Sequence, residues 1–405
     1  MMRKLLFLFT LATFQLIAQT DENLVAYFSF DDCTVNESNG KETQNGLSVG
    51  DPQCDCGVQG NALSFDGVDD RVAFTGPLVN EINFTDFSLS FYFKSFSNIG
   101  TQDLIAKRVD CNLQEAFAVR YIGRNDLIEV LLSENDSKTV LITAPVSATN
   151  CWQHVTVVRA NRDVFLYING DLKAEGRTST RADVGNTSPL LLSGSPCLNV
   201  TDRAFKGLLD EIRLYNRALS KEEVRGLYLS PDKIANPDTL IVLGNAVPTR
   251  ITATCATDFS WEPVEGVESP NSPNTLIRPV VAGVNPYYLT FNDGNCIATD
   301  SVLIRVVDPS ALDCTTVFLP NSFTPNGDNI NDTYGISNPF AIETFVAFEL
   351  FDRSGSRIFF SDSPTGRWNG TFKDQLVNPG TFLYRVIYMC QGEEITKTGS
   401  VTVIR

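Results

Sequence analysis

Few residues in this chain have the type and spacing that catalysis requires. His154 is the only histidine, so any catalytic triad would depend on it. It lies in an alternating stretch beside Trp152, where packing and hydrogen bonding account for it. Cys54 and Cys56 stand one residue closer than a CxxC pair, and no histidine lies near them. The sequence therefore predicts no triad and no zinc or redox site at these positions.

A dense polar turn near the end of the chain is a second candidate for chemistry, at residues 319–334 (LPNSFTPNGDNINDTY). Pro325, Asn326 and Gly327 are three consecutive turn formers. Asp328 and Asp332 offer carboxylates that would suit a cation. An Asx-rich turn held by its own side chains explains the same residues, and we favour that interpretation.

Composition indicates a chain of several domains built mainly from strands. The 405 residues, 43% of them hydrophobic, suit two to four domains with sizeable cores. The chain has 27 Phe and only 3 Met, which favours strands over helices. Its formal charge is 32 − 48 = −16, which disfavours nucleic acid and anionic membranes as partners and is compatible with divalent cations or neutral glycans.

Residues 1–19 have the features of a secretory signal peptide. Arg3 and Lys4 form the positive region, an apolar run extends from Leu5 to Ile17, and Ala18 offers a cleavage site. A membrane anchor would need a longer apolar run, and no other segment is long and apolar enough to span a bilayer. We expect an exported, soluble mature chain.

The ten cysteines are expected to form disulfides outside the cytoplasm. Six lie before residue 200, two between 250 and 300, and two in the last segment. Even counts in each segment predict three independently closed domains. Cys33 is expected to join Cys54 or Cys56, leaving the other for Cys197. The other predicted pairs are Cys111–Cys151, Cys255–Cys296 and Cys314–Cys390.

Many short strands with one weak helical signal predict a β-sandwich over residues 20–230. Its length fits a jelly roll of two large sheets. Ser220 and Glu223 form a capping box that opens a short helix at the end of this domain.

This domain resembles the laminin-G-like, concanavalin A-like jelly-roll family. The resemblance rests on LVAYFSFDD, ALSFDGVDDRVAF, CWQHVTVVRANRDVFLYINGDLKAEG and FKGLLDEIRLYNRALSKEEVRGLY. It implies the fold, whereas function stays open because the family includes lectins, adhesion modules and accessory domains of enzymes.

The resemblance implies a calcium site. Asp31, Asp66 and Asp210 fall at strand ends that the fold brings to one region, and hard carboxylate oxygens suit Ca²⁺, here in a structural role. The alternative is that these residues cap turns or pair with Arg71 or Arg213. The ExDxxE strand of jelly-roll glucanases is absent, so we expect no enzyme activity.

A linker is predicted at residues 231–240 and a small sandwich at 241–308, with a buried Trp261. This part resembles the PKD-like or immunoglobulin-like spacers of bacterial surface proteins, although the WxxGDG signature of PKD repeats is missing.

Residues 314–405 resemble the gliding-motility-associated C-terminal domain of Bacteroidetes, a type IX secretion sorting signal that the family's machinery reads as a folded surface. Asn329 replaces the usual glycine, a small departure because Asn tolerates positive φ. The matching positions are Pro320, Asn321, Phe323, Thr324, Pro325, Asn326, Gly327, Asp328, Ile330, Asn331 and Asp332.

Together these features predict an all-β protein, a jelly roll followed by two small immunoglobulin-like sandwiches, secreted or displayed on the outer cell surface. Its expected partners are the type IX machinery and a glycan or extracellular polymer bound without catalysis, for adhesion or gliding. Tyr92, Tyr121 and Trp152 would stack on sugars or pack in the core. The alternatives are a glycoside hydrolase, or an accessory domain of one, and a purely structural stalk.

Overall fold

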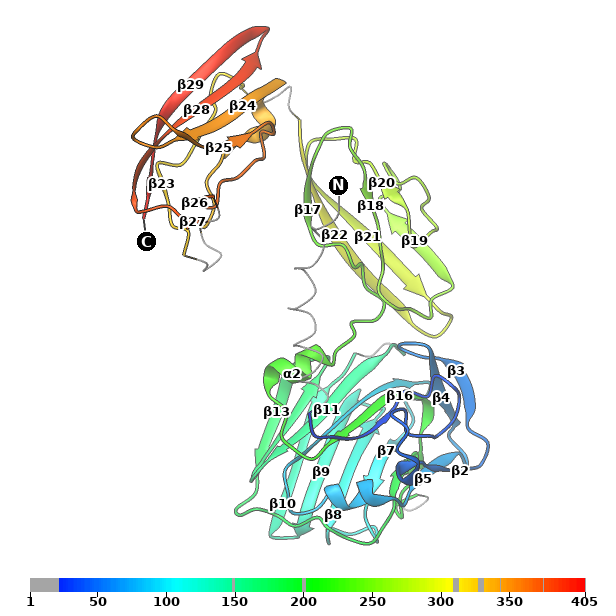
Figure 1. The fold of residues 1–405 in the computed structure, drawn as a ribbon. Coiled ribbons are helices and arrows are strands. Elements are labelled where there is room, and N and C mark those ends of the chain that lie inside the picture. The colour runs from blue at the N-terminus through cyan, green and yellow to red at the C-terminus, as the bar shows by residue number, and fades with distance from the viewer. Residues whose placement is uncertain are drawn as a thin grey trace.

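The computed structural model describes residues 22–147, 150–198, 202–308, 313–326, 331–342, 344–373 and 375–404. The predicted signal peptide lies outside the described residues. Three β-sandwiches follow one another along the chain (Figure 1): a head (residues 22–229), a middle sandwich (230–308) and a C-terminal sandwich (313–404). The all-β prediction is confirmed. None of the described helices has the length and hydrophobicity needed to cross a bilayer.

The head is a jelly roll of two eight-stranded sheets, as predicted. Sheet A has the order β13 (Asp171–Arg177), β12 (Asp163–Ile168), β11 (Gln153–Ala160), β6 (Phe87–Ser95), β16 (Lys206–Tyr215), β4 (Asn61–Asp66) and β3 (Gln53–Cys56), with β1 (Leu24–Phe28) beside β16. Sheet B has the order β10 (Lys138–Pro145), β9 (Leu127–Asn135), β8 (Ala116–Ile122), β7 (Thr101–Lys107), β14 (Leu190–Leu192), β5 (Arg71–Phe74) and β2 (Leu47–Val49), with β15 (Arg203–Ala204) parallel to β7.

Period-two alternation places the main core between the two sheets. Along β6, Phe87, Leu89, Phe91 and Phe93 face this core. The intervening residues, such as Tyr92 and the other polar members of the strand, are buried as well. The outer face of sheet A is therefore covered by other parts of the chain.

One cover of that face is the short helix α2 (Lys221–Gly226). Ser220 accepts a hydrogen bond from the Glu223 amide, and the Glu223 carboxylate accepts one from the Ser220 amide, so the predicted capping box is confirmed. Val224 of the helix packs with Tyr215 and Val158 on the outer face of sheet A.

The middle sandwich is built on Trp261, which is fully buried and donates from its indole nitrogen to the Ser272 carbonyl oxygen (2.9 Å). Its four-stranded sheet has the order β17 (Thr239–Val242), β22 (Ile297–Val307), β21 (Gly283–Asn292) and β19 (Asp258–Glu262), and β18 (Val247–Pro248) pairs with β20 (Leu276–Ile277). The segment predicted as a linker, 231–240, differs from that expectation: Ile234 joins this core and bridges to Ile251, and β17 begins at Thr239.

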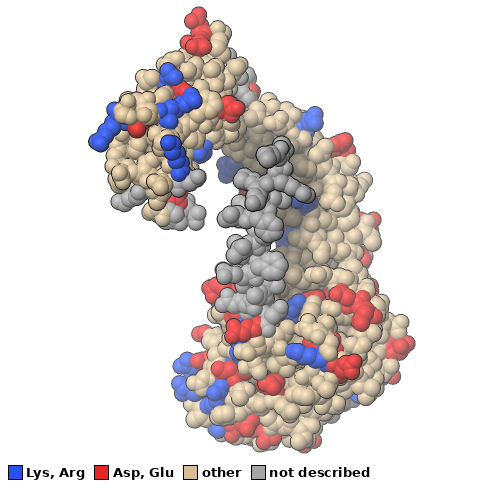
Figure 2. Space-filling view, in the orientation of Figure 1, with Lys and Arg blue, Asp and Glu red and all other residues tan. Residues whose placement is uncertain are grey.

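The C-terminal sandwich has a five-stranded sheet in the order β23 (Ser322–Phe323), β29 (Glu393–Val403), β28 (Gly380–Cys390), β24 (Thr344–Phe351) and β25 (Arg357–Ser361). A small hairpin, β26 (Thr371–Phe372) and β27 (Gln375–Leu376), lies apart from it. In the view of Figure 2, Lys and Arg side chains gather on this sandwich, whereas Asp and Glu are scattered over the head. Short 3₁₀ turns occupy Glu42–Gln44, Pro77–Glu81 and Pro339–Ala341.

Five disulfides join all ten cysteines, and their pairing differs in part from the prediction. Cys314–Cys390 is confirmed, and Cys33 joins Cys54, one of the two partners expected for it. The predicted pairs Cys111–Cys151 and Cys255–Cys296 are wrong, as is a bond from Cys56 to Cys197. The observed bonds are Cys111–Cys197, Cys56–Cys255 and Cys151–Cys296.

Two of these disulfides connect the head to the middle sandwich. Cys56–Cys255 and Cys151–Cys296 join the end of the middle sandwich to the sheet A side of the head. Lys94, on the outer face of sheet A, forms a buried ion pair with Asp293 of the middle sandwich. We call these three links the clamp. The clamp makes the middle sandwich part of the cover of sheet A rather than a free spacer.

Candidate functional site

The β4–β5 turn brings together the densest group of carboxylates found among the described residues. Strand β4 ends at Asp66 and β5 begins at Arg71, and Gly67 adopts a φ of +80° between them. Asp66 Oδ1 accepts a hydrogen bond from the Val68 amide (2.7 Å), which closes an Asx turn. Asp70 is buried and accepts bonds from the Asp66 amide (3.0 Å) and the Asp51 amide (2.7 Å).

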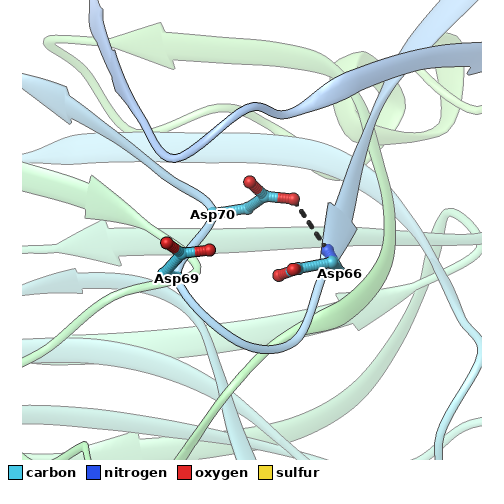
Figure 3. A group of neighbouring side chains, drawn as sticks. All are labelled: Asp66, Asp69 and Asp70. Carbon is cyan, nitrogen blue, oxygen red and sulfur yellow. Dashed lines mark hydrogen bonds between the residues drawn. The ribbon is translucent and has the colours of Figure 1, made fainter.

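Asp66, Asp69 and Asp70 form this acidic turn, and Figure 3 shows their side chains converging. One carboxylate oxygen from each lies within 4.8 Å of the others. Neither Lys nor Arg forms an ion pair with them in the parts of the chain described here. Carboxylate oxygens are the ligands that Ca²⁺ prefers, and each oxygen of Asp70 keeps a lone pair beside its hydrogen bond. These residues therefore fit a calcium ion whose coordination backbone carbonyls or water would complete.

The structure does not bring together the predicted set Asp31, Asp66 and Asp210. Asp31 contacts Asn61, whose side chain donates to the Asp31 carbonyl oxygen (2.7 Å), at the start of β4. Asp210 is fully buried and accepts from the Val58 amide (2.8 Å), in the turn that precedes β4. Asp66 lies at the other end of β4, so it shares a site with Asp69 and Asp70 instead.

Asp210 serves to hold that turn rather than to bind an accessible ligand. Burial, followed by the neighbouring charge of Glu211, raises the pKa of Asp210 to about 8. Its carboxylate also accepts from the Glu211 amide (2.8 Å). Glu211 itself pairs with Arg213, which covers the ring of Tyr27. The alternative that one of the three predicted aspartates pairs with Arg213 is therefore not what the structure shows, because Glu211 is the partner of Arg213.

A pocket of about 180 Å³ opens beside the acidic turn, and we call it the rim pocket. Gln102 fixes its floor, because its amide donates to the Ser97 carbonyl oxygen (2.7 Å) and accepts from the Lys206 amide (3.0 Å). Val68 and Ile99 stand at the pocket 76% and 59% exposed, so they offer apolar contacts to a ligand. Its lining comprises Gly67, Val68, Ser97, Ile99, Gln102, Leu198, Arg203, Ala204 and Lys206.

His154 is buried in the outer layer of sheet A. Its Nε2 lies 2.7 Å from Ser90 Oγ, and its ring stacks on Tyr92 with centroids 4.5 Å apart. Burial, with a smaller effect of Arg213, lowers the pKa of His154 to about 3, so the ring is neutral at pH 7. The packing interpretation of this histidine therefore holds.

The aromatic residues considered for sugar stacking belong to the interior. Tyr92 donates its hydroxyl to the Leu227 carbonyl oxygen (3.1 Å), and Tyr121 donates to Asp126 (2.7 Å). Trp152 packs with Tyr92 and Val58 under the segment that leads to the middle sandwich. All three are buried, so the stacking alternative is wrong for them.

A charged cluster on sheet B was not predicted. Arg120 pairs with Glu129 and with Asp202 (3.2 Å to Oδ2), and Asp103 accepts from the Ser195 hydroxyl (2.6 Å). Burial, opposed by the Ser195 bond and reinforced by Asp202, raises the pKa of Asp103 to about 6. The pairing of Arg120 with Glu129 across neighbouring strands was the one signal in the sequence that could have predicted this cluster. The alternation of residues along the strands does not show that β15 and Asp202 lie beside them.

The polar turn near the C-terminus is described in part. Phe323 is buried against Tyr334 and Trp368, and the Asn326 amide donates to Asp332 Oδ1 (2.8 Å). Asn331 adopts a positive φ of 56°. This bond supports the interpretation of a turn held by its own side chains. The matching positions Gly327, Asp328 and Ile330 lie outside the described residues.

Comparison with known proteins identifies two parts of the chain. Residues 66–225 match the concanavalin A-like lectin/glucanases superfamily, and residues 317–403 match the CHU_C type IX secretion signal domain. A search of curated proteins gives no match.

Several solved structures are similar in part. Domain 4 of AbnA, an extracellular arabinanase of Geobacillus stearothermophilus in complex with arabinotriose, is 21% identical, with a TM-score of 0.40 over 51% of this chain and 98% of that one. The CBM40 of a Ruminococcus gnavus sialidase bound to α2,6 sialyllactose is 16% identical, with a TM-score of 0.32 over 36% and 83%. The binding domain of Paraclostridial Mosquitocidal Protein 1 is 15% identical, with a TM-score of 0.45 over 92% and 88%.

Proposed function

Because this chain joins a concanavalin A-like jelly roll to a type IX secretion signal domain that directs it to the cell surface or beyond, we propose that its head binds a glycan or matrix polymer without catalysis. The observation that carries the proposal is the rim pocket, with its fixed polar floor and its two exposed apolar side chains. Sugars offer both hydroxyl groups and apolar ring faces, so a site of this mixed character suits them.

The position of the pocket follows from what covers the rest of the head. The outer face of sheet A lies under α2 and the middle sandwich. On sheet B the Arg120 cluster is occupied by its own ion pairs. The rim between the β4–β5 turn and the start of β16 remains accessible, and it carries the pocket.

Calcium has a structural role in this proposal. Asp66, Asp69 and Asp70 would hold the ion, which would relieve the repulsion among three neighbouring carboxylates. Because Gly67 and Val68 of the same turn line the rim pocket, fixing the turn would also fix one wall of the pocket.

The non-catalytic part of the proposal is supported by the state of the ionisable groups. His154 is buried and neutral, and Asp210 is buried beneath the β3–β4 turn. Glycoside hydrolysis needs two carboxyl groups facing one sugar position, and no carboxylate is among the described residues that line the rim pocket.

The test is a glycan array probed with the full exported chain, first with calcium and then with a chelator. We expect the chain to bind at least one glycan. We also expect that glycan to remain intact on the array after the protein is washed off. Absence of binding under both conditions would refute it, and release of shortened oligosaccharides would show a hydrolase instead. The full chain is needed because a head fragment ending at residue 230 would leave Cys56 and Cys151 without their partners.

A purely structural stalk is the second candidate, and the clamp is the observation that favours it. Two disulfides and a buried ion pair hold the head and the middle sandwich in one orientation, as a rigid rod requires. This candidate predicts specific self-association, which analytical ultracentrifugation would detect. It also predicts that no glycan of the array binds.

A further inference from the structure

The rim pocket carries an excess of positive charge in an otherwise acidic chain. Arg203 and Lys206 both line it, and none of the lining residues that the structure describes is acidic. Neither cation forms an ion pair with any residue of the described ranges. The chain as a whole has a net charge of −16, so the positive charge of the pocket is opposite in sign to that of the whole chain.

The backbone near each cation is fixed while its charged end stays exposed. Arg203 lies in β15, which pairs with β7 in parallel register. Its Nε lies 3.1 Å from the position that a β-carbon on Gly100 would occupy. Gly100 has a φ of +73°, which glycine adopts without strain. The missing side chain of Gly100 also leaves room for the arginine to lie across the β6–β7 turn. Lys206 is held through its amide, which donates to Gln102.

Two carboxylates adjacent to this pair, one across the strands and one in sequence, have other partners. Asp66 lies opposite Lys206 in the β4–β16 register, yet its Oδ1 accepts from the Val68 amide of its own turn. Asp202, next to Arg203 in sequence, is buried and pairs with Arg120. The two cations therefore keep their capacity for a ligand.

We propose that the rim pocket binds an anionic sugar unit, one that carries a carboxylate or a sulfate, and this rests on the proposed glycan-binding function. The guanidinium of Arg203 offers a planar pair of donors that matches such a group, and Lys206 adds a second positive charge. Val68 and Ile99 contact the apolar face of the ring, while Gln102 keeps the pocket open. Because the acidic surface repels anions at long range, recognition depends on these local contacts.

The test measures binding of the full exported chain to three oligosaccharides of equal length: a uronic acid polymer, a sulfated polymer and a neutral polymer. We expect one of the two anionic probes to bind more than about tenfold tighter than the neutral probe. The double variant Arg203→Gln/Lys206→Gln should lose about ten- to a hundredfold for that probe, as the removal of charge-assisted bonds predicts.

The matched control is Lys221→Gln/Arg250→Gln, which removes two exposed cations outside the pocket. It should bind as the unchanged protein does. Equal losses in both double variants would overturn the inference, because binding would then follow net charge alone. Equal or tighter binding of the neutral probe would overturn the inference but leave the glycan-binding function standing. If none of the probes and no glycan of the array binds, both fail.

Discussion

At the scale of single residues, His154 offers a clean test of the buried layer on sheet A. Because it is the only histidine, its ring protons give one set of NMR signals. Its folded pKa of about 3 lies below the ordinary value of 6.5. The unfolded chain therefore takes up a proton below pH 6.5, whereas the folded chain does not until about pH 3.

The expected result is that the ring signals do not shift between pH 8 and pH 5 in the folded protein, and titrate near pH 6.5 in denaturant. The free energy of unfolding should lose about 1.4 kcal/mol from this group for each pH unit below 6.5. A midpoint between pH 6 and 7 in the folded protein would contradict the buried placement beside Tyr92 and Ser90.

Asp69 provides the residue-scale test of calcium. It is exposed, and its change to Asn removes one ligand charge from the acidic turn. We expect calcium to raise the melting temperature of the unchanged protein, with a gain of about 2.7 kcal/mol at a hundredfold excess over Kd, and Asp69→Asn to lose most of it. Asp136→Asn, at an exposed position outside the turn, is the control. An equal melting temperature with calcium and with chelator would refute the site.

Sequence reasoning found one member of this turn and missed the other two for a physical reason. Asp31, Asp66 and Asp210 were grouped because all three were expected at strand ends that the resembled fold brings to one region. In the structure Asp66 ends β4, whereas Asp210 lies inside β16. Strand β4 separates Asp31 and Asp210 from Asp66. Asp69 and Asp70 were visible as a pair in the sequence, and the turn geometry needed to aim them at Asp66 appeared only with the fold.

At the scale of elements, local signals were predictable and pairings were not. The capping box of α2 depends on residues three positions apart, so the sequence was sufficient to find it. Even cysteine counts were compatible with closed domains. However, the six cysteines of the head can equally form two bonds within the head and two bonds to another domain, as they do here. The docking of the middle sandwich on the head decides between these two disulfide patterns. Docking depends on contacts between residues that are far apart in the sequence.

The clamp leads to a prediction on stability. Peptides of the unreduced protein should contain the Cys56–Cys255 and Cys151–Cys296 links when mapped by mass spectrometry. Replacing Cys151 and Cys296 by Ser should lower the free energy of unfolding of the head by about 2–5 kcal/mol, because the bond closes a long loop. The matched control replaces Cys314 and Cys390, whose bond lies within the C-terminal sandwich, and should leave the head unchanged. Links that stay within each sandwich would disprove the clamp.

At the scale of the whole molecule, the type IX secretion signal domain and the proposed binding site lie in separate sandwiches. The type IX secretion signal domain ends the chain, and the rim pocket lies on the head, with the clamped middle sandwich between them. A reporter fused to residues 314–405 should therefore reach the cell exterior in a host with the type IX machinery, without the head. A reporter that stays in the periplasm would show that the C-terminal sandwich alone is insufficient.

If the machinery reads a folded surface, export should depend on the core of this sandwich rather than on its exposed apolar residues. Phe323 is 2% exposed and packs on Tyr334 and Trp368, so Phe323→Ala should cost about 3–5 kcal/mol and unfold much of the population. Phe318 is 57% exposed, and Phe318→Ala should fold and be exported as before. Circular dichroism of the purified domains verifies folding, and the reporter assay gives export. Export of an unfolded Phe323→Ala domain would mean that a linear segment, not the folded surface, is what the machinery reads.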